Sequence, residues 1–236
     1  MEYVIIITAV GLLILAHEAG HLCAALAHRL PVEQFSIGFG PRLWSVRRRE
    51  TEYRLSAIPI GGYVLPKVHS DEEWLAVPLR SRLAFSLGGP VANGIVALGL
   101  LAAAGCLESG LSLTTIILAP LVGFHQLVTH VWAALPAALH HPDQLSGVVG
   151  IAAFGGREVG RDSSMLLRFA ALLSVNLAIF NLLPVPPLDG GTIVMSLVQR
   201  VYRPLGRLRL PLALAGWCAL ALLFLYTTAM DVYRLV

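Results

Sequence analysis

Two histidines and a glutamate near the N-terminus have the types and spacing of a metal-binding, hydrolytic centre. His17, Glu18 and His21 form an HExxH pattern inside the apolar run 4–26. On a helix, residues four apart leave the same face, so both imidazoles could bind one ion. In zinc hydrolases with this pattern the glutamate is not a ligand but the general base that activates water. The motif therefore predicts a zinc site and metal-assisted hydrolysis.

The setting of this motif is a helix long enough to cross a membrane. At about 1.5 Å per residue, the run 4–26 matches a hydrocarbon layer of about 30 Å. An ionised side chain at mid-bilayer costs about 2.5 to 3.5 kcal/mol on insertion scales, so Glu18 needs compensation. The alternative is an interfacial polar cluster near the end of the helix. An interfacial cluster would need no further metal ligand. A candidate third ligand elsewhere in the chain would therefore favour the metal site.

The composition is that of a membrane protein rather than of a soluble domain. Of the 236 residues, 56% are hydrophobic and 13% are charged, and the mean hydropathy is +0.74. The segments apolar and long enough to span are 4–26, 83–106, 165–183 and about 212–230. We predict an all-α polytopic membrane protein of about four transmembrane helices in a single domain, residues 1–236. Residues 1–3 carry no basic flank, so the first span is not expected to be a cleaved signal peptide.

Basic residues are concentrated on one side of the predicted spans. Thirteen of the 17 Lys and Arg lie either between the first two spans or between the last two. The positive-inside rule makes these loops cytoplasmic and places both termini outside. The net charge of +3 is explained by a basic face next to anionic lipid, so nucleic acid is not expected as a partner.

The segment 34–66 predicts a β-hairpin associated with the membrane. Apolar residues alternate with smaller or polar ones on either side of a charged tip at 47–50. Gly61 and Gly62 follow, and two glycines allow a backbone to bend or to approach another closely. Two placements remain open. The hairpin lies on the membrane surface, or it dips toward His17 and offers an edge strand to an extended substrate.

Two other stretches are ambiguous. Asn93, in the second span, is a polar group that needs a partner in lipid, either at the metal site or on a neighbouring helix.

The region 111–139 begins apolar but is interrupted by polar residues, and from Leu121 its apolar residues recur at intervals of three and four. A single apolar stripe suits a helix lying in the interface, so we predict an interfacial helix there rather than a fifth span.

Asp189 is the candidate third ligand. It follows the third span and directly precedes Gly190 and Gly191. If 111–139 does not cross, the first and third spans run in the same direction, and Asp189 reaches the side and depth of His21. Two histidines, one carboxylate and a water make a tetrahedral zinc site with one exchangeable position. The alternative is that Asp189 caps the helix that starts near Gly191.

With these motifs in place, the sequence resembles the site-2 protease family of intramembrane zinc metalloproteases. The matching motifs occur in the family's order at residues 17–21, 35–41, 60–64, 89–93 and 181–191. The resemblance covers nearly the whole chain except about residues 107–144. Within it, the combination of HExxH with Leu-Asp-Gly is highly specific.

The resemblance implies a zinc endopeptidase of the bacterial cell membrane. His17, His21 and Asp189 would bind one catalytic Zn²⁺, and Glu18 would activate water. Its partners would be the lipid bilayer and single-span membrane proteins, such as anti-sigma factors or signal-peptide remnants. These substrates would be cut within or near their transmembrane segment, on the cytoplasmic side of the membrane.

The resemblance also implies residues that hold the substrate. Asn181 would help hold the substrate backbone or the tetrahedral intermediate. Gly61, Gly62 and Tyr63 would belong to a hairpin that clamps the substrate as an added strand. Asn93 is a further candidate for this group. Many bacterial members carry PDZ domains between the second and third spans, whereas the segment 107–146 is mostly apolar and shorter than the usual domain size of about 50 residues or more. We therefore expect no PDZ domain here.

Two other functions compete with proteolysis. A metal transporter should carry acidic or histidine residues on several spans, whereas the other spans here offer mainly Asn93, Ser174, Asn176 and Asn181. A catalytically silent scaffold would be expected to lack the general base, yet Glu18 is present. The intramembrane endopeptidase remains the leading hypothesis.

Overall fold

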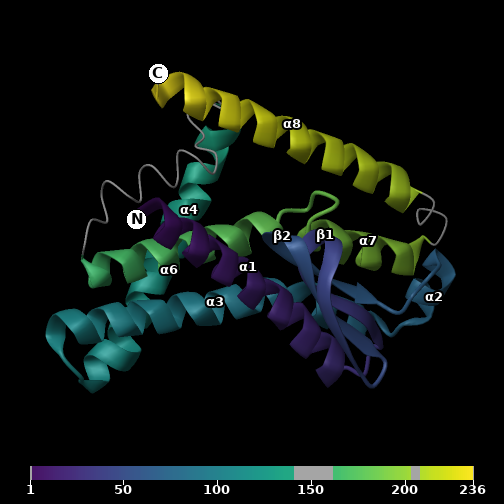
Figure 1. Cartoon of the computed structure of the whole chain (residues 1–236), viewed down its shortest axis with the longest axis horizontal. Coiled ribbons are helices and arrows are strands. Elements are labelled where there is room, and N and C mark those ends of the chain that lie inside the picture. Colours follow the sequence, from purple (N-terminus) through teal and green to yellow (C-terminus); the bar gives the residue numbers. More distant parts are fainter. Residues whose placement is uncertain (1, 141–161, 203–207, 236) are drawn as a thin grey trace. The chain divides into compact units, whose positions relative to one another are not determined.

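A computed structural model describes residues 2–140, 162–202 and 208–235 (Figure 1). Its helices are α1 (Glu2–Ala27), α2 (Asp71–Ala76), α3 (Leu79–Ser109), α4 (Ala119–His140), α6 (Ser163–Asn181), α7 (Asp189–Val201) and α8 (Arg209–Leu235), and a π-helical turn, Thr114–Leu118, precedes α4. Two strands, β1 (Val32–Arg48) and β2 (Thr51–Pro66), form the sheet of the described residues. The predicted fold class, helical with one hairpin, is confirmed.

Five of the described helices are long and apolar enough to cross a membrane. Three of the four predicted spans lie within α1, α3 and α8, and the predicted span 165–183 coincides with α6 except for its last two residues, which supports a multi-pass membrane protein. The fifth candidate is Thr114–Ala137, made of the π-helical turn and most of α4. Its length and composition allow a crossing. The interfacial placement of 111–139 therefore stays a prediction.

The contacts of the chain group it into two compact units. One comprises Met1–Val10, Gly94–Ile179 and Ala215–Val236, and the other comprises Gly11–Asn93 and Phe180–Leu214. All the site residues predicted from the sequence belong to the second unit.

An apolar core between α3, α4 and α6 holds the first unit together. Its buried members are Ala97, Leu101, Val131, Ala171, Val175 and Ile179. Phe124 and Val128, which belong to the periodic stripe of 111–139, pack against this core. Much of the stripe that predicted an interfacial face is thus a contact between helices.

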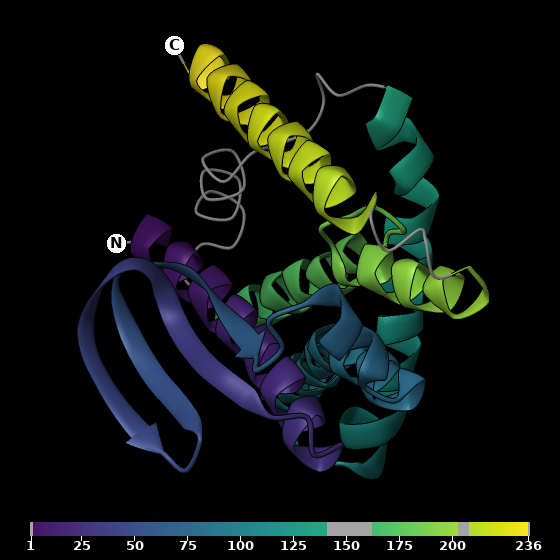
Figure 2. The same ribbon diagram turned by 90° about the vertical axis from the view of Figure 1, so that its right-hand side faces the viewer.

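The hairpin of the second unit is a long, curled ribbon (Figure 2). The segment 34–37 of β1 pairs with 62–65 on one side and with 52–55 on the other. Gly61 lies at the entry to 62–65 with a φ of 92°, a backbone conformation that favours glycine. Among the described residues, 62–65 pairs only with β1. This segment is therefore an edge of the sheet.

A small apolar core fixes the base of the hairpin to the helices around it. Ala25 of α1, Leu30, Val32 of β1 and Trp74 of α2 are buried together, and Phe85 of α3 packs against them. The C-terminal end of α1, the start of the hairpin and the start of α3 thus share one core. The motif in α1 is held between these elements.

Helices α1 and α3 cross at two glycines. A Cβ on Gly20 would collide with the carbonyl oxygen of Gly88, and a Cβ on Gly88 would come 2.5 Å from the carbonyl oxygen of Gly20. Real Cβ atoms do not approach an oxygen this closely, so the separation of the two backbones requires glycine at both positions. The crossing brings the histidine face of α1 directly against α3.

We expect Gly20→Ala to lower the stability of the protein in detergent by about 1 to 3 kcal/mol or more, because the added methyl group overpacks the crossing. Thermal unfolding of the purified protein measures this. Gly11→Ala is the matched control, since a Cβ there meets nothing within 4 Å. Equal melting temperatures for the two variants would show that the close crossing is not required.

Candidate metal centre

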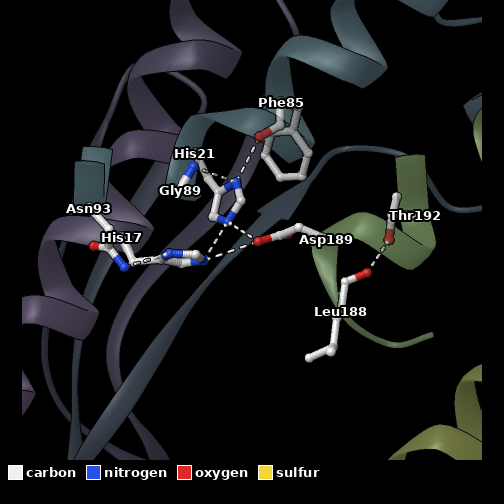
Figure 3. A network of polar contacts seen from close by, with 8 residues as sticks. All are labelled: His17, His21, Phe85, Gly89, Asn93, Leu188, Asp189 and Thr192. Carbon is white, nitrogen blue, oxygen red and sulfur yellow. Dashed lines mark hydrogen bonds and ion pairs between the residues drawn. The ribbon is translucent and has the colours of Figure 1, made fainter. Parts of the chain in front are cut away.

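The side chains of His17, His21 and Asp189 converge on one point (Figure 3). Nε2 of His17 is 3.1 Å from Nε2 of His21 and 3.1 Å from Oδ2 of Asp189. Nε2 of His21 is 3.4 Å from the same oxygen. Both histidines are buried. The structure thus brings the distant aspartate to the two histidines of the motif.

The triangle of ligand atoms fits a tetrahedral zinc ion. Zinc bonds of about 2.0 to 2.1 Å at tetrahedral angles place neighbouring ligand atoms about 3.3 to 3.4 Å apart, within a few tenths of an ångström of the three separations. No other group of three His, Cys, Asp or Glu in the described ranges meets the same condition. Burial raises the pKa of the Asp189 carboxyl, but its hydrogen bonds with His17 and His21 outweigh burial and hold that pKa below the ordinary value. The carboxylate is therefore charged, as a zinc ligand must be.

Hydrogen bonds on the far side of each imidazole direct its Nε2 toward this triangle. Nδ1 of His21 lies 2.7 Å from the carbonyl oxygen of Phe85 and 3.4 Å from the backbone nitrogen of Gly89. Because the closer partner is an acceptor, we assign the proton to Nδ1, which leaves the Nε2 lone pair for a metal. Nδ1 of His17 lies 3.2 Å from the side-chain amide of Asn93. A metal-bound His17 would donate from Nδ1, which requires the amide oxygen of Asn93 to face it. The two ends of an amide have the same shape, so this assignment follows from the chemistry.

Asp189 is positioned by a loop that folds onto the start of α7. The N-cap of α7 is Leu188, with an extended backbone, so Asp189 is the first residue of the helix and not its cap. A Cβ on Gly190 would collide with the carbonyl of Leu182, and one on Gly191 would come 2.5 Å from the backbone nitrogen of Pro186. The Gly-Gly pair therefore lets the preceding loop lie against the helix and direct the carboxylate to the histidines.

Glu18 lies against the edge strand of the hairpin. Its carboxylate accepts a hydrogen bond from the backbone N–H of Val64, and a Cβ on Gly62 would come 3.2 Å from its Cγ. The next side chain, Tyr63, stacks on Phe39 with ring centroids 6.0 Å apart. The hairpin therefore contacts the motif, whereas its depth in the membrane and its pairing with a substrate stay predictions.

Two contributors to the site were not identified from the sequence. A Cβ on Gly89 would lie 2.5 Å from Nε2 of His17 and would also touch Nε2 of His21, so the bare backbone of α3 forms one wall of the site. The glycines of the second span were a signal, but their order does not tell which one faces the ligands. Phe85 acts through its carbonyl, which every residue has, so no sequence signal could have found it.

The remaining candidate site residue is Asn181. Asn181 is the last residue of α6 and precedes the loop that leads to Asp189. Its expected contact with substrate stays a prediction, as do the substrate contacts of Gly61, Gly62 and Tyr63.

The fold and the site together define a polytopic helical membrane protein with a His-His-Asp cluster that could hold a metal ion. Comparison with known families agrees, because the model of Peptidase family M50 matches residues 5–224. The chain therefore belongs to peptidase family M50, and the resemblance to site-2 proteases is confirmed. Zinc is the metal that this membership implies.

Relatives of this chain are assigned by name to the zinc metalloproteases. A Clostridium acetobutylicum protein is 40% identical over 120 residues, which cover 48% of this chain and 34% of that protein. A Clostridium perfringens protein is 26% identical over 86% of this chain and 89% of its own length. A Synechocystis protein is 24% identical over 82% and 83%. The chain thus spans about a third of the first relative and most of the other two.

We expect Gly89→Ala to lower zinc affinity by at least about tenfold, because the methyl group would occupy space that the ligand nitrogens enclose. Metal content of the purified protein, measured by mass spectrometry after dialysis against a zinc buffer, tests this. Gly99→Ala on the same helix is the control, since a Cβ there meets nothing within 4 Å. Full zinc content in Gly89→Ala would contradict the placement of the ion.

Proposed function

We propose that this protein is an intramembrane zinc endopeptidase that hydrolyses peptide bonds within or near the membrane-spanning segment of single-span proteins. The observation that carries the proposal is the triangle that Asp189 forms with the buried His17 and His21. Both histidines lie on a helix long enough to span, with Glu18 beside them. Membership in family M50 and the names of the relatives point the same way.

Each residue of the site has a separate task in this proposal. His17, His21 and Asp189 hold one zinc ion, which when bound would polarise the scissile carbonyl and lower the pKa of a water to about 7. Glu18 accepts the proton of the attacking water and passes it to the leaving amine, as a general base and then a general acid. Asn93 is reassigned from substrate binding to positioning, because its amide faces His17.

The edge strand is the proposed substrate-binding element. A transmembrane helix satisfies its own amides, so it must unwind before its backbone reaches a catalytic site. The segment 62–65 has an unpaired edge among the described residues and lies against Glu18. An unwound stretch added to this edge would regain backbone hydrogen bonds and lie beside the general base.

The setting of the reaction follows from the charge distribution of the chain. By the positive-inside rule, the basic loops support a site toward the cytoplasmic side of a bacterial cell membrane. With four spans, both termini would then lie outside. Membrane-tethered regulators, such as anti-sigma factors, and signal-peptide remnants are the proposed substrates. Asn181 is proposed to hold the substrate backbone near the ligands.

Glu18→Gln should retain zinc and lower cleavage of a single-span model substrate by about 10²- to 10⁴-fold, since it removes proton transfer and leaves the ligands intact. Cleavage in reconstituted liposomes and metal content are both measured.

His17→Ala and Asp189→Ala should lose zinc and cleavage together. Turnover by Glu18→Gln at the wild-type rate would refute the assigned role. A zinc-loaded wild type that cuts no single-span substrate would favour a silent scaffold.

Gly62→Ala should lower kcat/KM for the same substrate by about 10- to 100-fold while zinc content stays unchanged. The new Cβ would come 2.7 Å from the carbonyl oxygen of Ser36 and 3.2 Å from Glu18 Cγ, so it would displace the edge strand relative to the base. Gly11→Ala, which adds the same group in open space, is the control. Unchanged kcat/KM in Gly62→Ala would argue against substrate binding at this edge.

A further inference from the structure

A second polar site lies near the C-terminal end of α7, whereas Asp189 lies at the N-terminal end of this helix. An open cavity of about 270 Å³ lies between the end of α2, the start of α3 and the end of α7, and the polar side chains that line it are Arg82, Gln199 and Arg200. At about 1.5 Å per residue, Gln199 is roughly 15 Å along the helix from Asp189. The cavity is therefore separate from the metal centre.

Polar groups at this cavity are buried without partners. Arg82 is 4% exposed and Gln199 is 2% exposed. Within the described part of the chain, Nε and Nη1 of Arg82 and both amide atoms of Gln199 have no hydrogen-bond partner. Burying a guanidinium and an amide without partners is unfavourable. The arrangement is thus incomplete without a ligand that accepts and donates hydrogen bonds.

The charge around the cavity selects an anion. Arg200 and Arg209 both lie close enough to Arg82 for their positive charges to act on it. Arg209 is neutralised, because it pairs with Asp71 at 3.2 Å and lies 5.2 Å from the ring centroid of Trp74. Across the described ranges, no carboxylate lies within 4.0 Å of Arg82 or Arg200. Two uncompensated positive charges therefore line the cavity.

The position of the cavity along the spans indicates where that anion comes from. Arg82 lies in the first turn of the candidate span Leu79–Ser109, and Arg209 begins the candidate span Arg209–Arg234. The ends of membrane spans lie at the depth of the lipid headgroups. Leu79, at the N-terminus of α3, also lines the cavity, and the first N–H groups of a helix favour negative charge.

We propose that Arg82, Gln199 and Arg200 bind the phosphate group of an anionic membrane lipid. The Arg82 guanidinium donates to two phosphate oxygens, and Arg200 supplies the second positive charge. The Gln199 amide donates to the phosphate and accepts from a hydroxyl of the headgroup. A lipid bound there fastens the end of α7 to the start of α3, the two helices that carry Asp189 and Gly89. The proposal does not depend on proteolysis, since it concerns binding alone.

The test measures lipid binding by delipidated protein in detergent, using native mass spectrometry. The wild type is titrated with phosphatidylglycerol, with phosphatidylcholine and with inorganic phosphate. We expect the wild type to prefer phosphatidylglycerol, and Arg82→Gln and Arg200→Gln to bind it about tenfold more weakly. Arg80→Gln is the matched control, because it removes the same charge two residues away, from an exposed position that does not line the cavity. This variant should bind as the wild type does.

Three results would overturn the proposal. Phosphatidylglycerol binding by Arg82→Gln and Arg200→Gln equal to that of the wild type would exclude these arginines. An equal loss of phosphatidylglycerol binding in Arg80→Gln would show that the weaker binding reflects the net charge of the protein and not this cavity. Binding of inorganic phosphate without a preference for phosphatidylglycerol over phosphatidylcholine would assign the site to a soluble anion. Arg200 is exposed, so Arg200→Gln decides the question alone if Arg82→Gln does not fold.

Discussion

The metal centre depends on the close approach of the α1 and α3 backbones at Gly20 and Gly88. At that separation, three positions of α3 spaced by four residues, 85, 89 and 93, face the two histidines. The carbonyl of position 85 orients one imidazole, the amide of position 93 orients the other, and the bare backbone of position 89 leaves room between them. Any side chain at the crossing would separate all three from their partners at once.

Charge balance explains how such a site exists inside an apolar helix. The imidazoles of His17 and His21 lie beside both carboxylates, Glu18 and Asp189, and the N–H of Val64 donates to Glu18. A divalent cation held by the three ligands would offset negative charge at the site, which would lower the cost of placing it in a low-dielectric layer. The hairpin contributes a backbone donor to Glu18, the N–H of Val64, which the interior of a helix could not supply because its amides are already bonded.

The parts predicted from the sequence are those set by local spacing. The four spans follow from the length of apolar runs, the charged tip of the hairpin from four consecutive charged residues, and the shared face of His17 and His21 from their spacing. Asp189 followed from the direction of two spans. The sequence could not show which neighbour an element meets. The apolar stripe of 111–139 is the clearest case, because hydrophobicity is the same toward lipid as toward the core that includes Val131 and Val175. Likewise, the roles of Phe85 and Val64 belong to their main chains.

The free edge of the hairpin has a consequence for the choice of cleavage site. In an added strand, side chains alternate between the two faces, and a shift by one residue exchanges the faces. A substrate paired to 62–65 with one favoured set of side chains turned toward the hairpin would therefore shift in steps of two residues. Its alternative cleavage positions would then be separated by even numbers of residues, a periodicity set by the enzyme's own main chain.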